Sequence, residues 1–270
     1  MTWMSSASRT AAHTLVPSRI ALATTVALMI FAATANAQTP APQPAPAPAT
    51  LETVVVTGSR INRPELAATA PTLSIGSDIL ALIRHLKADS AFVIGTSMAA
   101  GASVWAAAEA PGLIRGLVLI GPFVRGGGDV TSRLMYGALF ARPWGPAMWL
   151  KYFNTLYPTR QPADFAAYTA ALHANLKAPG RMEALHKMLM ASKLASEERL
   201  PRVTAPVKVL MGSKDRDFKD PEAEAKLVAT SLRGTYHMIE NAGHYPHAEM
   251  PDLVGPIILA TLKEFHEKQS

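Results

Sequence analysis

Three residues of the sequence, Ser97, Asp215 and His244, have the types that nucleophilic catalysis by a serine requires, and they occur in the order serine, acid, histidine. A serine hydroxyl is a poor nucleophile until a histidine accepts its proton, and a carboxylate must hold that histidine in the productive tautomer. Each of the three follows an apolar run, so a parallel sheet would place them along its carboxyl edge. Whether the three side chains lie close together depends on the strands and helices around them.

Ser97 lies between the apolar run "AFVIG" and an alanine-rich stretch that we expect to be helical over residues 98–110. A serine on a strand-to-helix turn adopts an unfavourable backbone conformation, which is tolerable only when nearby side chains are small. Gly95 and Ala99 meet this requirement and give G-x-S-x-A, a variant of the nucleophile elbow. The backbone N–H of Met98 would point at the same spot as an oxyanion-hole donor. The alternative is a serine that only caps the helix.

The acid candidates follow the apolar run Val207–Met211, which ends at Gly212. Asp215 lies on the loop after that glycine, and Asp217 and Asp220 are alternatives in the same loop. Asp220 precedes a proline and is typical of a helix start. The alternative for all three is a solvated turn residue.

The base candidate is His244, on a loop after a short strand expected at Tyr236–Ile239. The glycine before it permits a tight turn that can swing the imidazole over the sheet edge. We expect His237 to pack in the strand or face solvent, and His247 to stand behind the site. An H-x-x-H metal site is the competing interpretation, but Pro246 prevents the helical presentation that zinc pairs prefer. No metal and no cofactor are therefore expected.

The elements that carry these residues alternate in type. Ser77 is expected to cap a helix whose apolar face runs from Ile79 to Leu86, ahead of the elbow strand. The stretch "LIRGLVLIGP" supplies the next strand, Leu117–Ile120. The order helix, strand, helix, strand favours parallel strands joined by crossover helices, which is an α/β fold.

At this point the chain resembles the α/β-hydrolase family in four ordered stretches, "VIGTSMAAGASVWAAAEAP", "GLVLIGPF", "VKVLMGSKD" and "NAGHYPHAEMP". The resemblance covers residues 76–270. It implies a partial α/β-hydrolase fold, in which helices and a helical lid flank a mostly parallel sheet. It also implies Ser97 as nucleophile, Asp215 as acid and His244 as base, acting on an ester or related carbonyl substrate; perhydrolysis would use the same residues. A serine at the elbow argues against the dehalogenase and epoxide-hydrolase branches, which use aspartate there.

The family places its lid where this chain has residues 125–200, a segment too long for one crossover. Helices are expected around 163–176 and 181–195. We expect the aromatic side chains mostly to pack the lid, and a minority to line a pocket for an apolar acyl or alkyl group. These aromatics are Trp144, Trp149, Tyr152, Phe153, Tyr157 and Tyr168, and Met182, Met188 and Met190 are expected in the lid core.

The first 37 residues are typical of a secretory signal peptide. Arg9 and Arg19 give a positive start, the apolar stretch "IALATTVALMIFAA" follows, and Ala35-Asn36-Ala37 offers a cleavage site. The apolar stretch is shorter than the ~20 residues that a membrane-spanning helix needs. We therefore expect export, to the periplasm or beyond.

Residues 38–75 comprise a Pro/Ala-rich linker and a segment with strand propensity. Five prolines in "TPAPQPAPAP" favour an extended spacer, and we expect this N-terminal extension to be disordered. The following "ETVVVTGSRI" resembles the mature start of TonB-dependent outer-membrane receptors. That resemblance implies that Glu52–Gly58 pairs with a TonB-type partner by strand addition. No series of amphipathic strands follows to make a barrel, which argues against receptor function.

Near Leu73–Ser77 the resemblance to TonB-dependent receptors ends and the resemblance to α/β-hydrolases begins. This indicates a receptor-like start joined to the later part of a hydrolase. A complete family member has further strands before the elbow helix, and one of their loops, often with His-Gly, donates the second oxyanion-hole N–H. Residues 1–75 contain no His-Gly. We therefore expect an exposed sheet edge and impaired turnover. The alternative function is a non-catalytic periplasmic fragment, and if the joining is not natural, the hydrolase part belongs in the cytoplasm.

Composition excludes other function classes. The chain has no cysteine, so disulfides, thiolate metal sites and cysteine nucleophiles are excluded. The net charge of +6 is spread along the sequence without a basic stripe, which argues against nucleic-acid binding. The resemblance to the α/β-hydrolase family implies that the partner is a small-molecule substrate.

Overall fold

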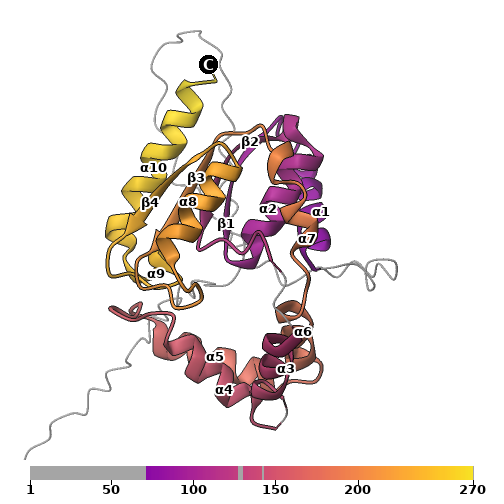
Figure 1. Ribbon diagram of the computed structural model, residues 1–270, viewed down its shortest axis with the longest axis vertical. Helices are drawn as coiled ribbons and strands as arrows, with labels where there is room; N and C mark the ends of the chain where they lie inside the picture. Colours follow the sequence, from indigo (N-terminus) through magenta and orange to yellow (C-terminus); the bar gives the residue numbers. More distant parts are fainter. Residues whose placement is uncertain (1–70, 127–129, 142, 270) are drawn as a thin grey trace, which may run out of the picture.

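The computed structural model describes residues 71–126, 130–141 and 143–269 of the chain. The predicted signal peptide, and the linker and receptor-like segment up to residue 70, lie outside the described residues. Within the described part, four strands form one sheet in the order β1-β2-β3-β4, and each neighbouring pair is parallel (Figure 1). They are β1 (Ala91–Thr96), β2 (Ile114–Ile120), β3 (Val207–Gly212) and β4 (Thr235–Ile239). The four predicted strands and the parallel α/β architecture are confirmed.

The described helices precede, connect and follow these strands. They are α1 (Pro71–His85), α2 (Met98–Glu109), α3 (Val130–Leu139), α4 (Gly145–Asn154), α5 (Phe165–Lys177), α6 (Arg181–Leu189), α7 (Leu194–Glu197), α8 (Pro221–Ser231), α9 (Pro246–Glu249) and α10 (Pro251–Glu267), with 3-10 turns η2 (Pro111–Leu113) and η3 (Leu200–Arg202). Helix α2 therefore follows the predicted elbow directly, and α9 follows the predicted histidine loop.

Side chains of the strands alternate between two apolar layers, because successive residues of a strand point to opposite faces. Val93 and Leu117 are fully buried in the layer beneath α1, α2 and α8. Phe92 and Val118 are buried in the other layer, beneath α10. The sheet is thus covered on both faces, as parallel sheets require.

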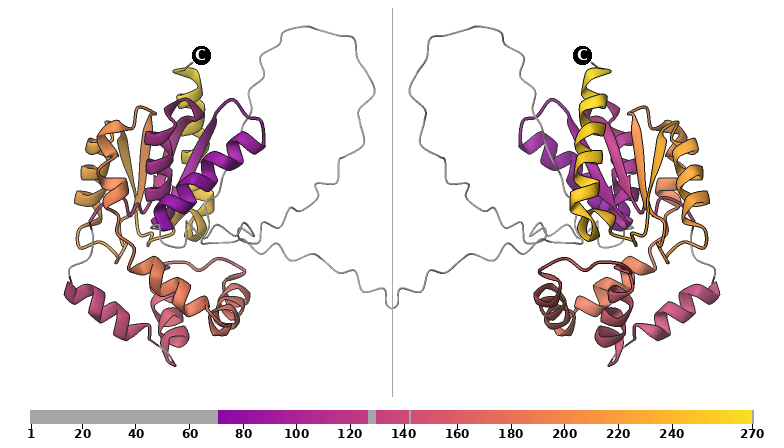
Figure 2. Two further views of the ribbon diagram at one scale, coloured as in Figure 1. Left: turned by 90° about the vertical axis from the view of Figure 1, so that its right-hand side faces the viewer. Right: turned by 90° about the vertical axis from the view of Figure 1, so that its left-hand side faces the viewer.

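Helices α3, α4, α5 and α6 form a separate layer at the carboxyl ends of the strands (Figures 1 and 2). Trp149 and Met182 are buried in this layer, so the expected lid core is present there. Phe153 is buried in a second cluster that also contains Tyr245 of the predicted histidine loop. The lid is therefore packed onto the sheet through the segment that carries His244.

Two element boundaries differ from the sequence prediction. Helix α1 begins at Pro71, so Ser77 lies inside it and caps nothing. The glycine at position 76 serves helix packing, since a Cβ there would lie 2.4 Å from Trp105 Cε3 of α2. The second predicted lid helix, 181–195, is interrupted after Leu189 and resumes as α7.

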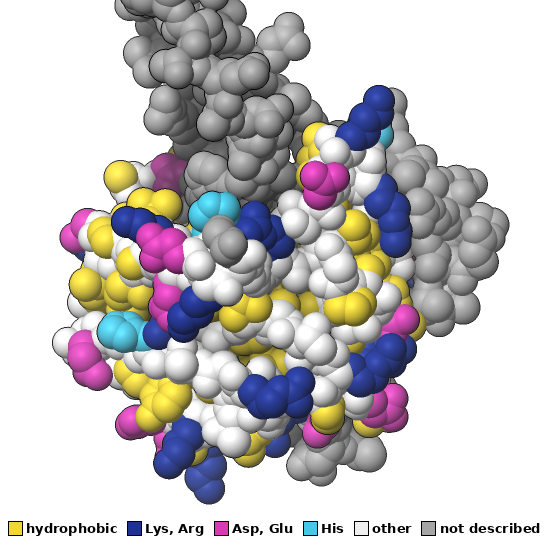
Figure 3. Space-filling model, turned by 90° about the horizontal axis from the view of Figure 1, so that it is seen from above, with side chains coloured by type: hydrophobic (Ala, Val, Ile, Leu, Met, Phe, Trp, Pro, Cys, Tyr) yellow, Lys and Arg dark blue, Asp and Glu magenta, His cyan; other side chains and the backbone are white. Residues whose placement is uncertain are grey.

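Charged side chains of both signs are interspersed on the face opposite the lid (Figure 3). This agrees with the diffuse charge of the sequence. Among the residues with a described structure, no helix combines the length and the apolar character needed to cross a membrane.

Candidate active site

Ser97 occupies a sharp turn between β1 and α2. Its backbone has φ 56° and ψ −125°, a conformation that residues other than glycine rarely adopt. Small neighbours allow it, because a Cβ on Gly95 would lie 2.5 Å from Ser103 Oγ. Ser97 makes no capping hydrogen bond to α2, so the alternative of a simple helix cap does not describe its side chain. The local structure is that of the predicted elbow.

The turn at Ser97 is held against the neighbouring strand. Ser97 N–H donates to the carbonyl of Ile120 at 2.9 Å, and Phe123 N–H donates to the carbonyl of Ser97 at 3.2 Å. Met98 is the first residue of α2, and the N–H groups of a first helical turn have no carbonyl partner within the helix. The predicted oxyanion donor therefore lies where a helix favours negative charge.

Asp215 and His244 form a buried pair. His244 Nδ1 lies 2.7 Å from Asp215 Oδ2, and both side chains are at most 1% exposed. Because the carboxylate accepts, Nδ1 carries the proton and donates it, which leaves Nε2 as the acceptor nitrogen. The other oxygen, Asp215 Oδ1, accepts from the N–H of Asp217 at 3.0 Å, which orients the carboxylate.

Two opposing effects set the pKa of His244. Burial favours the neutral ring and lowers the pKa, whereas the hydrogen bond to Asp215 and the charges of Asp215 and Asp217 raise it. The net result is a raised pKa. The environment therefore stabilises the imidazolium that forms when the ring accepts a proton.

Close packing fixes the ring of His244. Gly121 has φ +52°, and a Cβ there would lie 3.1 Å from His244 Cε1. The ring of Phe123 lies 5.4 Å from the imidazole, and that of Tyr245 lies 4.8 Å away in a T-shaped contact. Sequence analysis missed Gly121, for which the only signal is the glycine directly after the β2 run.

The structure brings His244 and Asp215 together and places Ser97 beside the same turn, residues 120–123, without a bond between serine and histidine. His244 Nε2 is buried and has no hydrogen-bond partner among the described residues. The nitrogen that would accept a proton from Ser97 is therefore unoccupied by any other described group.

The remaining predicted acids and histidines have distinct surroundings. Asp217 lies beside the pair, with Oδ2 3.6 Å from His244 Nδ1. Asp220 accepts from the N–H of Ala223 and caps α8, as predicted. His237 is exposed on β4. His247 contacts Tyr245, and burial lowers its pKa to about 4.

Sequence analysis also missed Glu249, a buried residue of α9. Its carboxyl group accepts from the N–H groups of Thr159, Arg160 and Gly243 at 2.7, 3.0 and 2.6 Å. These bonds join the segment after α4 to the residue that precedes His244. Nothing in the local sequence distinguishes this glutamate from a surface acid.

The acid–base cluster also contains donor atoms close enough for a cation. Ligand atoms of Asp215, Asp217 and His244 lie within 4.8 Å of one another. Hydrogen bonds already use them, because the Tyr152 hydroxyl donates to Asp217 and His244 donates to Asp215. The cluster is accounted for as a hydrogen-bonded network.

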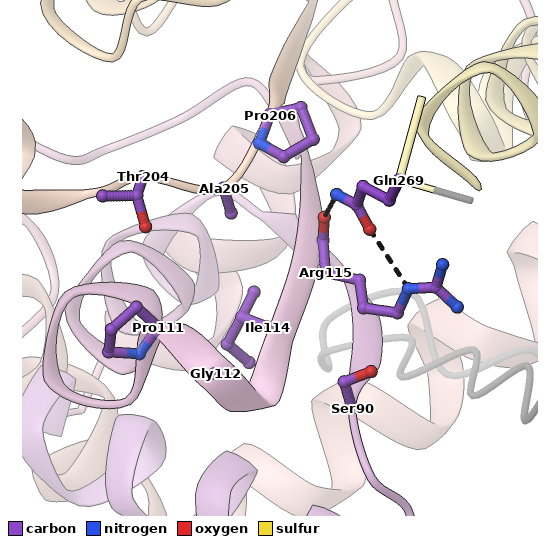
Figure 4. Close-up of a pocket in the computed structure, with 9 residues that line it drawn as sticks. All are labelled: Ser90, Pro111, Gly112, Ile114, Arg115, Thr204, Ala205, Pro206 and Gln269. Atoms are coloured by element: carbon purple, nitrogen blue, oxygen red, sulfur yellow. Dashed lines mark hydrogen bonds between the residues drawn. The ribbon is translucent and has the colours of Figure 1, made fainter. Parts of the chain in front are cut away.

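An open pocket of about 370 Å³ lies elsewhere, beside the amino ends of β2 and β3 (Figure 4). Arg115 Nε donates to Gln269 Oε1 at 3.1 Å, and Gln269 Nε2 donates to the carbonyl of Arg115 at 2.6 Å. Neither Ser97 nor His244 lines it. The pocket is therefore separate from the acid–base pair.

Comparison with known families gives one match that spans most of the chain. The sequence model described as "Alpha/beta hydrolase family" matches residues 48–255. This range begins before residue 76, where the sequence resemblance begins, and includes the stretch compared with receptors. The receptor resemblance gains no support from this match and stays a prediction.

Curated relatives and solved structures are similar at lower identity. The chain is 29% identical to monoglyceride lipase of Mus musculus over 176 residues, which are 62% of this chain and 55% of the relative. The chain thus spans about half the length of that relative. An esterase from Exiguobacterium antarcticum superposes with a TM-score of 0.60 at 19% identity, over 71% of this chain and 74% of that one. A thermophilic esterase from Thermogutta terrifontis gives 0.58 at 23%, over 73% and 74%.

Proposed function

The chain belongs to the alpha/beta hydrolase family, and we propose that it is a serine hydrolase of esters or related carbonyl compounds. The observation that supports this most directly is the buried Asp215–His244 pair, whose Nε2 has no hydrogen-bond partner among the described residues. The backbone of Ser97 bonds to Ile120 and Phe123, and the His244 ring lies against Gly121 in the same turn. The backbone of Ser97, at φ 56° and ψ −125°, is a strained conformation of the kind found at functional sites.

In the proposed reaction, Ser97 Oγ attacks the carbonyl carbon while His244 Nε2 accepts its proton. Asp215 holds Nδ1–H and stabilises the imidazolium, and the N–H of Met98 donates to the oxyanion. The imidazolium then protonates the leaving alcohol, and the acyl group stays on Ser97. Water, deprotonated by the same nitrogen, attacks the acyl-enzyme and releases the acid. The reaction requires Oγ and Nε2 to come within hydrogen-bonding distance, a contact that often tightens only when substrate binds.

We extend the proposal to substrates with an apolar acyl or alkyl group. Rings of Phe123 and Phe218 lie 4.9 Å apart and both contact the ring of His244. Curated relatives named monoglyceride lipase and solved structures named esterase are consistent with such substrates. Most aromatic side chains of the lid are buried within clusters that involve the lid. We therefore propose that the surface that selects the acyl or alkyl group is the part of the lid that faces His244.

Turnover is expected to be lower than in complete members of the family. Met98 is the one oxyanion donor that the sequence identifies, and loss of one donor costs about 10²–10³ in turnover. Strand β1 pairs only with β2 among the described strands, so the elbow strand lies at one edge of the described sheet. We expect both features to slow attack by Ser97.

The test is turnover of p-nitrophenyl esters of increasing acyl length, together with covalent labelling by a fluorophosphonate. We expect slow turnover, labelling at Ser97, and loss of both in Ser97→Ala. The matched control is Ser192→Ala, an exposed serine of the lid side. Absence of labelling in a folded wild-type protein, or labelling that survives Ser97→Ala, would contradict the proposal.

A second proposal concerns export and the segment Glu52–Gly58, which lies outside the described residues. The signal-like residues 1–37 and the "ETVVVTG" stretch favour a periplasmic protein that pairs with a TonB-type partner. The test is capture of the purified chain by the periplasmic domain of such a partner. Deletion of residues 52–58 should abolish capture, and capture without them would refute this proposal.

A further inference from the structure

Asp217 lies between the lid and the acid–base pair. The hydroxyl of Tyr152, on lid helix α4, donates to the carboxylate and lies 2.6 and 2.7 Å from its two oxygens. Asp217 Oδ2 lies 3.6 Å from His244 Nδ1, and the N–H of Asp217 donates to Asp215 Oδ1. One residue therefore contacts the lid, the acid and the base.

The carboxylate of Asp217 is largely buried, which is energetically costly without stabilising partners. Its side chain is only 9% exposed, and a buried carboxylate is costly unless a cation or hydrogen-bond donors stabilise it. In the described part of the chain, the His244 ring is the one group with a positive form that lies within ion-pairing distance. The site thus places two carboxylates around one imidazole and secures the second through a lid residue.

We propose that Asp217 is a positioning residue for His244 and that Tyr152 makes its effect depend on the position of the lid. The inference rests on the proposed hydrolase function, in which His244 is the base. Asp217 adds negative charge beside the imidazolium that forms when Ser97 is deprotonated. Tyr152 can hold that charge in place only while α4 packs against the loop that carries Asp215 and Asp217.

The electrostatic surroundings agree with this role. Burial raises the pKa of Asp217, whereas the charge of His244, the Tyr152 hydrogen bond and Arg216 lower it, and Asp215 raises it. The titratable groups that face His244 are Asp215 and Asp217 from the loop after β3, and Tyr245 and His247 from its own segment. The net result is a raised pKa of Asp217. Loss of the Tyr152 hydrogen bond would raise this pKa further, which favours the protonated, uncharged carboxyl group.

A purely structural role for Asp217 makes a different prediction. If the Tyr152–Asp217 bond only fastened the lid, its removal would lower stability but leave the protonation of His244 unchanged. If Asp217 acts on the base, its removal shifts the titration of His244 even in a protein that stays folded.

The experiment is an NMR titration of the His244 ring in the full chain without substrate, with the resonance assigned through His244→Gln. We expect Asp217→Asn to lower the pKa of His244 by about one unit, because a nearby opposite charge shifts a pKa by one to three units. Tyr152→Phe should lower it less, and the double variant should match Asp217→Asn, since Tyr152 acts through Asp217. Asp217→Glu should retain the wild-type titration.

Matched controls are Asp220→Asn, an exposed carboxylate of the same loop, and Tyr136→Phe, a tyrosine of lid helix α3. Neither should move the titration of His244. Equal titration in wild type, Asp217→Asn and Tyr152→Phe would overturn the inference, as would additive shifts in the double variant. If Asp217→Asn fails to fold, Tyr152→Phe still decides it, because only an effect on the base shifts the titration of His244. The readout needs no turnover, so absence of fluorophosphonate labelling would refute the proposed function separately.

Discussion

The two sides of the candidate site are held by different kinds of contact, side-chain and backbone hydrogen bonds on one side and backbone hydrogen bonds on the other. On the acid–base side, His244 bonds to Asp215, its backbone N–H donates to the carbonyl of Leu156, and Glu249 secures the preceding residue. On the nucleophile side, the backbone of Ser97 bonds to the turn after β2, and β1 has one neighbouring strand among those described. The comparison suggests that the base is assembled in advance, whereas the serine must complete its contact with it.

The largest expected effect comes from breaking the assembled pair. Asp215→Asn keeps the size of the side chain but removes the acceptor that fixes the tautomer of His244. We expect turnover to fall by about 10⁴-fold, as for the same change in a serine protease. The measurement is kcat with a p-nitrophenyl ester, and Asp220→Asn is the control. If kcat falls by less than about tenfold, Asp215 is not the acid.

Glu249→Ala tests whether the acid–base side depends on its buried support. The substitution leaves three backbone N–H groups without their acceptor, and each buried unsatisfied group costs about 1–3 kcal/mol. We expect a loss of several degrees in Tm and a parallel loss of activity. Glu240→Ala removes an exposed glutamate and should change neither. An unchanged Tm in Glu249→Ala would show that these hydrogen bonds do not stabilise the fold.

Gly121→Ala probes the contact between the two sides. Alanine at φ +52° costs about 1–2 kcal/mol, and its Cβ would press on His244 at 3.1 Å. We expect a modest loss of stability and a larger loss of kcat, because the imidazole moves relative to Ser97. Gly112→Ala is the control, since a Cβ there meets nothing within 4 Å. Equal changes in stability and kcat in both variants would show that Gly121 does not position His244.

The smallest expected effect is a shift in the pH profile. His244 must be neutral to accept the proton of Ser97, so kcat/KM falls as pH drops through the pKa of His244. Because Asp215 and Asp217 raise that pKa, the acid limb should lie above about 6.5, the ordinary value for histidine. The measurement is kcat/KM for a neutral ester across pH 4–9. An acid limb below the ordinary value would mean that burial outweighs the two carboxylates.

Local patterns were enough to predict much of the fold and the sharp turn at Ser97, whereas the role of Ser97 as nucleophile stays a prediction. Apolar runs bounded by glycine marked β1 and β3, and the small residues around Ser97 indicated its sharp turn. The capping role of Asp220 followed from the proline after it, and the structure confirms it. These features depend on a few consecutive residues, which is why the sequence alone reveals them.

Apart from the Asp215–His244 pair, which the family resemblance implied, the contacts between distant residues were not predicted. Tyr152 and Asp217 are 65 residues apart, and Glu249 bonds to Thr159 across 90 residues. Gly76 makes close contact with Trp105 on another helix, and no local pattern in the sequence indicates that contact. In each case the residue type is common at such a position. Its structural role depends on contact with a residue that is distant in the sequence, which local patterns do not reveal.

The most direct test of the account is a crystal structure of the full chain that measures the distance from Ser97 Oγ to His244 Nε2. With a bound phosphonate or ester analogue, the account predicts that the serine oxygen and Nε2 lie within hydrogen-bonding reach, about 2.6–3.2 Å apart. A separation beyond about 5 Å, with another group bonded to Nε2, would contradict it.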